Sequence, residues 1–66
     1  MTRPLTEAQR HALQTAAEGQ PLKMVARDLG ITVVAAKNRR RDAMRKLGVS
    51  TVPAAVAVAM RLGAVR

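Results

Sequence analysis

The chain has 66 residues, enough for one small domain, and its 12 Lys and Arg against 4 Asp and Glu give a formal net charge of +8 at pH 7. Without cysteine it has neither disulfides nor thiolate metal sites, and no apolar stretch is long enough to cross a membrane. It has no Phe, Tyr or Trp, the side chains on which single-strand binders and most RNA readers stack bases. The charge therefore indicates a polyanionic partner, and the composition favours duplex DNA.

The first predicted helix covers residues 7–18. Thr6 and Gln9 form a Thr-x-x-Gln capping box at its start, and Gly19 lies where the apolar periodicity ends. Apolar residues at helical spacing predict that its inner face consists of Leu13, Ala16 and Ala17.

The second predicted helix covers residues 21–29 and is expected to end at Gly30. Pro21 is placed in its first turn, where a missing N–H removes no helical hydrogen bond. A small residue at Ala26, followed by a sharp reversal at Gly30, suits two helices that cross steeply. The buried stripe of this helix is predicted to be Leu22, Val25, Ala26 and Leu29.

The third predicted helix covers residues 33–47, with Thr32 as its cap, and it has two faces. Of the ten residues 37–46, six are basic and only Asp42 is acidic, so like charges repel one another unless an anion neutralises them. The stem of Arg40 is expected to pack along the helix edge. The apolar face comprises Val33, Ala36, Ala43 and Leu47, and the opposite face comprises Lys37, Asn38, Arg41 and Arg45, with Val34 among them.

The fourth predicted helix covers residues 52–62, is capped by Ser50 or Thr51, and completes an all-α, four-helix domain over residues 1–66. From Pro53 to Leu62 its only charged residue is Arg61, so the helix is apolar on all sides and must be buried on more than one. Because so small a domain covers only one face, the other is expected to meet a second copy. The alternative is that the fourth helix is buried in the core of its own domain. The residues predicted for an exposed dimer interface are Ala54, Val58 and Val65.

Residues along almost the whole chain match the pattern of one known family in register: Leu5-Thr6, Ala17-Glu18-Gly19, Lys23, Val25-Ala26, Leu29, Ile31-Thr32, Lys37, Lys46-Leu47-Gly48-Val49 and Ala55-Val56. By these residues the chain resembles the C-terminal DNA-binding domain of LuxR-type (GerE- or FixJ-type) transcription regulators over residues 5–65. The resemblance implies four helices, the third of which lies in the major groove while the fourth pairs two subunits on an inverted-repeat site. The start at Met1 favours a stand-alone regulator over an excised domain.

The resemblance and the two-faced third helix together assign roles to individual side chains. By position, the residues that match the base-reading surface of the family are Lys37, Asn38 and Arg41. Lys and Arg favour guanine, whereas Asn favours adenine. The residues expected at the DNA backbone are Lys23, Arg39, Arg40, Arg45 and Lys46.

These observations predict a sequence-specific, double-stranded DNA-binding transcription regulator that acts as a homodimer on an inverted-repeat operator, in the cytoplasm with the nucleoid. The alternative is a small helical adaptor that binds RNA polymerase or a full-length regulator through the apolar fourth helix. Binding of the basic helix to a membrane surface is a weaker alternative, and no membrane partner is expected. The sequence has no catalytic set and a single histidine, His11, so we expect no enzymatic activity, no metal and no cofactor.

Overall fold

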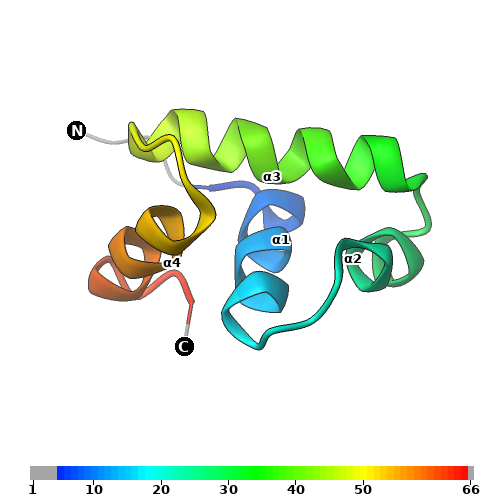
Figure 1. The fold of residues 1–66 in the computed structure, drawn as a ribbon, viewed down its shortest axis with the longest axis horizontal. Coiled ribbons are helices and arrows are strands. Elements are labelled where there is room, and N and C mark those ends of the chain that lie inside the picture. Colours follow the sequence, from blue (N-terminus) through cyan, green and yellow to red (C-terminus); the bar gives the residue numbers. More distant parts are fainter. Residues whose placement is uncertain (1–4, 66) are drawn as a thin grey trace.

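The computed structural model describes residues 5–65, which form four helices: α1 (Glu7–Ala17), α2 (Leu22–Leu29), α3 (Val33–Leu47) and α4 (Val52–Arg61). Within these residues there is no strand, and the predicted all-α class is confirmed. α3 lies across the other three helices, with α1 beneath its middle and α2 and α4 beneath its two ends (Figure 1). α1 contacts every other helix, whereas α2 and α4 do not contact each other.

Three threonines begin three of the helices. Thr6 and Gln9 form the predicted capping box: the Gln9 N–H donates to Thr6 Oγ1 at 3.1 Å, and the Thr6 N–H donates to Gln9 Oε1 at 3.0 Å. Thr32 accepts a hydrogen bond from the backbone N–H three residues later at 3.0 Å, and Thr51 does the same at 3.3 Å. Of the two candidates for the α4 cap, Thr51 is therefore the one that acts.

The observed helices are one residue shorter than predicted at three of their ends. Glu18 and Leu62 are C-cap residues, and Pro21 is the N-cap of α2 with an extended backbone (ψ 158°), so it precedes the first turn instead of lying in it. The left-handed ends of α2 and α3 are present as predicted, at Gly30 (φ 66°) and Gly48 (φ 70°).

The core consists of two small clusters beneath α3. One lies between α1, α3 and α4, and the other lies between α1, α2 and α3, so α1 and α3 contribute to both. The largest fully buried side chains are Leu13 and Val25, one in each cluster. The first cluster comprises Leu13, Ala43, Ala55, Ala59 and Val65, and the second comprises Ala12, Val25, Ala26 and Ala36.

Two predicted inner faces are partly wrong. Ala17 is exposed and Ala16 only half-buried, because α1 ends there and the chain turns away; Ala12 and Thr15 are buried beside Leu13 instead. Val33 is 50% exposed, and it is the first residue of α3.

Val65 was expected in an exposed interface, and this expectation is wrong. The residue is only 4% exposed and belongs to the first core cluster. The chain turns back after α4 through Gly63 (φ 73°), and the Ala64 N–H donates to the carbonyl of Ala59 at 2.9 Å. This return directs Val65 inward, where it cannot contribute to a contact with a second copy.

No helix in the described part of the chain has the length and apolar character needed to cross a membrane.

Candidate nucleic-acid interface

A short turn joins α2 to α3 and fixes the angle between them. The Ile31 N–H donates to the carbonyl of Ala26 at 2.9 Å, and the Gly30 N–H donates to that of Arg27 at 3.3 Å. Because the backbone of Gly30 is in the left-handed conformation, the chain reverses within three residues and enters α3 at the Thr32 cap. Beneath the turn Ala26 and Ala36 share a core cluster, and their small side chains allow the close helix approach of a helix-turn-helix.

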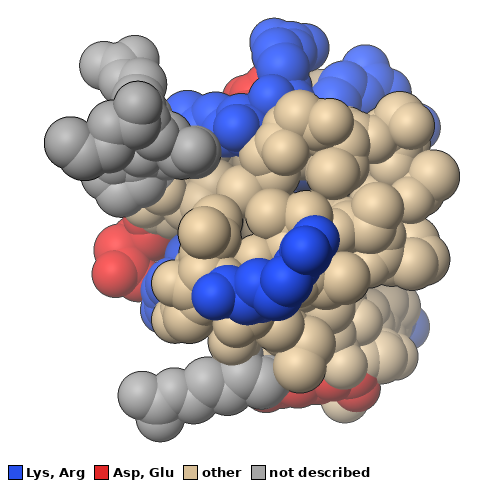
Figure 2. Space-filling view, turned by 90° about the vertical axis from the view of Figure 1, so that its left-hand side faces the viewer, with Lys and Arg blue, Asp and Glu red and all other residues tan. Residues whose placement is uncertain are grey.

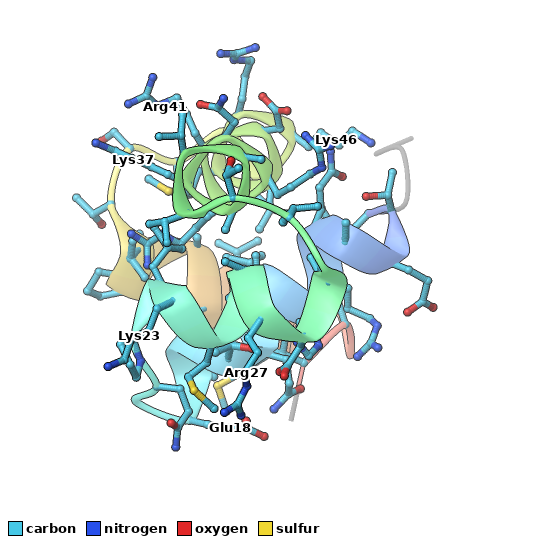
Figure 3. The ribbon with its side chains drawn as sticks, turned by 90° about the vertical axis from the view of Figure 1, so that its right-hand side faces the viewer. Glu18, Lys23, Arg27, Lys37, Arg41 and Lys46 are labelled. Carbon is cyan, nitrogen blue, oxygen red and sulfur yellow. The ribbon has the colours of Figure 1, made fainter. Side chains whose placement is uncertain are left out.

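The side of α3 that faces away from the body carries Val34, Lys37, Asn38, Arg41 and Arg45, all exposed; we call these five residues the outer face. The buried side is anchored by Ala36 and Ala43, both 0% exposed. Viewed along α3, Lys37 and Arg41 project from the helix away from α1 (Figure 3). The structure thus brings together all three residues predicted to read bases.

The remaining basic side chains of α3 lie on its flanks. Arg39 is exposed, whereas Arg40 and Lys46 are half-buried. Lys46 lies on the opposite side of α3 from Lys37 in Figure 3. Arg40 lines a hollow of about 180 Å³ at the start of α4, together with Lys37, Arg41, Met44 and Val52.

Lys23 extends this arrangement to α2. The residue is exposed, and in Figure 3 its side chain lies on the same side of the molecule as Lys37 and Arg41. Arg27, also exposed on α2, is directed away from α3. Exposed basic side chains therefore occur on both helices of the motif.

The charge on α3 is largely unbalanced within residues 5–65. Arg45 lies 3.8 Å from Asp42, and Arg27 on α2 lies 3.9 Å from Asp28. These weak, exposed contacts neutralise little. The basic residues of α2 and α3 without an acidic partner among the described residues are Lys23, Lys37, Arg39, Arg40, Arg41 and Lys46.

Two features of the site region have no clear signal in the sequence. His11 Nε2 lies 3.1 Å from Asp28 Oδ2, which ties α1 to α2, and a separation of 17 residues gives no periodic pattern that would predict the pair. Val34 is 70% exposed on the outer face; helical spacing placed it on this side but gave it no role.

No group of metal-binding side chains is found among the residues that the structure describes.

Comparison with known proteins gives a consistent result. The family model of the luxR family of bacterial regulatory proteins matches residues 3–59, most of the chain. A solved structure described as "Structure of Transcription factor, GerE" superposes with a TM-score of 0.87 and 28% sequence identity, covering 97% of each chain. Among curated proteins, none matches the sequence.

Proposed function

The chain belongs to the luxR family of bacterial regulatory proteins, and on this premise we propose that it regulates transcription by binding a specific sequence of double-stranded DNA through the outer face of α3. The observation that carries the proposal is the exposure of Lys37, Asn38 and Arg41 on one side of a helix whose other side is buried. The major groove is about 12 Å wide and admits a helix, so these side chains would reach base edges.

The flanking cations support the affinity of such a complex. Lys23, Arg39, Arg40 and Lys46 have no acidic partner among the described residues, and Arg45 has only a distant one. Contacts of these five residues with phosphates would release condensed counterions, so the affinity would fall steeply with salt. Such contacts orient the protein on the duplex, while the base contacts provide the specificity.

Selection from a library of randomised duplexes tests the proposal. The wild type is expected to enrich one sequence motif, and Lys37→Ala is expected to lose preference at one base pair of each half-site by roughly 5- to 150-fold. Arg27→Ala is the matched control, because it removes one exposed positive charge from the same motif but on a side directed away from α3. Its motif should equal that of the wild type.

Two results would count against these assignments. Enrichment of no motif at all would contradict sequence-specific binding. An unchanged motif for Lys37→Ala would show that this residue does not read a base.

We further propose that the protein acts as a homodimer on an inverted repeat, paired through α4. The outward surface of α4 is mainly apolar: Ala57 and Met60 are exposed beside the charged Arg61, and the predicted interface residues Ala54 and Val58 are half-buried. Figure 2 shows this end of the molecule as a largely uncharged surface with basic side-chain atoms lying across it and further Lys and Arg above. If two copies pair through these surfaces about a two-fold axis, the same axis relates their α3 helices. The DNA site that binds both helices would then be an inverted repeat.

The same apolar surface supports the adaptor as a second candidate. A small protein that binds RNA polymerase or a full-length regulator would use α4 as its contact and would not need the outer face of α3. Binding of the isolated protein to duplex DNA at physiological salt separates the two functions, because only the regulator requires it.

A further inference from the structure

Val34 occupies the first turn of α3 and is the one aliphatic member of the outer face. Successive residues of a helix are separated by about 100°, so Val34, Asn38, Arg41 and Arg45 form one stripe along the middle of the exposed side. Val34 is 70% exposed and belongs to neither core cluster. Its side chain therefore makes no evident contribution to packing within residues 5–65.

The position of Val34 is well defined although its side chain is exposed. The Thr32 hydroxyl accepts a hydrogen bond from the Ala35 N–H at 3.0 Å, which fixes the first turn of the helix. β-Branched side chains such as valine have one strongly preferred χ1 rotamer in a helix, so the two methyl groups are also held in place. An apolar group is thus presented in a fixed position at the end of the stripe.

This inference rests on the proposed function: if α3 enters the major groove, Val34 enters it too. The C5-methyl of thymine is the apolar group that a base pair exposes in that groove. Asn38 lies one turn further along the stripe, about 6 Å along the helix axis, which corresponds to one or two base-pair steps. We propose that Val34 contacts a thymine methyl at this distance from the base read by Asn38, and that it specifies a T·A pair there.

Replacement of thymine by uracil in the selected duplex tests the contact, because it removes the methyl group and leaves the hydrogen-bonding edge unchanged. For the wild type, one thymine of each half-site should be sensitive, with a loss of affinity of about fourfold for one buried methyl. For Val34→Ala, affinity for the thymine duplex should fall by a similar factor, and the same uracil should have little further effect.

Val33→Ala is the matched control, since it makes the same substitution one residue earlier, at a half-exposed position off the stripe. It should retain the full response to uracil. Far-ultraviolet circular dichroism checks that both variants fold, and alanine favours helix formation at either position.

The other outcomes of this experiment contradict either the thymine contact alone or the proposed function as well. If the wild type selects a motif in which no thymine is sensitive to uracil, or if Val34→Ala remains as sensitive as the wild type, the contact does not exist, although the proposed function stands. If the wild type selects no motif, the proposed function fails, and this inference fails with it.

Discussion

At the residue scale, exposure distinguishes two kinds of basic side chain on α3. Lys37 and Arg41 are exposed on the outer face, whereas Arg40 is half-buried beside the hollow at the start of α4. A long cationic side chain can stabilise a fold through its methylene groups and bind an anion through its head. Substitution at Arg40 can separate the two contributions, because the residue is half-buried and carries a charge.

We predict that Arg40→Met keeps most of the stability of the wild type but weakens DNA binding. Methionine retains an unbranched apolar stem and removes the charge. The negative slope of log K against log salt should therefore become less steep, by about 0.9 for each phosphate contact that is lost. Arg40→Ala should show the same binding defect together with a loss of stability of about 0.5–1 kcal/mol. Urea unfolding and titrations at several salt concentrations measure the two effects. If the salt slope is unchanged for both variants, Arg40 does not contact a phosphate.

At the element scale, the start of α3 depends on Thr32. Its side chain satisfies one of the N–H groups that the first turn leaves unpaired, and the turn before it contains the left-handed Gly30. Val34 and Lys37 follow within the next two turns, so the cap holds the part of α3 that we assign to the bases.

We predict that Thr32→Ala lowers the free energy of unfolding by about 1 kcal/mol, because it removes the cap hydrogen bond. Fraying of the first turn should also reduce affinity for the selected duplex more than affinity for random DNA. Thr32→Ser is the control, since serine keeps the hydroxyl and caps helices at least as well. A Thr32→Ala protein as stable as the wild type would show that the cap contributes nothing measurable.

Local sequence signals predicted the elements of this fold well. The Thr6–Gln9 capping box, the Thr32 cap and the glycine ends of α2 and α3 all depend on residues within a few positions of one another, and all are present. The apolar stripe of α2 and the two faces of α3 follow from helical periodicity, and Ala26, Ala36 and Ala43 are buried as expected.

The errors arose where tertiary contacts determine burial. Periodicity places Ala17 and Val33 on inner faces, but each lies at a helix end that no neighbouring helix covers. Val65 lies beyond the last helix, where no periodic pattern applies, and the return of the chain after Gly63 buries it. The His11–Asp28 pair likewise depends on how α1 packs against α2. Apart from Val65, the residues assigned to bases, phosphates and dimerisation remain predictions.

At the scale of the whole molecule, the apolar end formed by α4 is far from α2, with which α4 has no contact. Met60 and Leu62 are 54% and 60% exposed there. Pairing of two copies would cover these side chains and leave both α3 helices free to meet a duplex.

We predict that Ala57→Glu makes the protein monomeric and weakens binding to the inverted repeat, because it introduces a charge at an exposed position in the middle of the α4 surface. Gln20→Glu is the control: it adds the same charge at an exposed position in the turn after α1. Sedimentation equilibrium should give a dimer for the wild type and for Gln20→Glu only, and their unfolding temperatures should rise with protein concentration. A monomeric wild type at concentrations that saturate the operator would contradict dimerisation.

The alanines beneath α3 also affect how this interior can change during evolution. Six of the nine buried apolar residues in the described chain are alanine, and larger side chains such as Leu47 and Ile31 pack against them while remaining partly exposed. At the alanine positions nothing can be truncated further without glycine, and a larger side chain would force the backbones apart. Neutral drift is therefore restricted to small residues or to paired changes that conserve volume. Alanine-scanning mutagenesis would give no information on the alanine positions of this core, because it leaves an existing alanine unchanged.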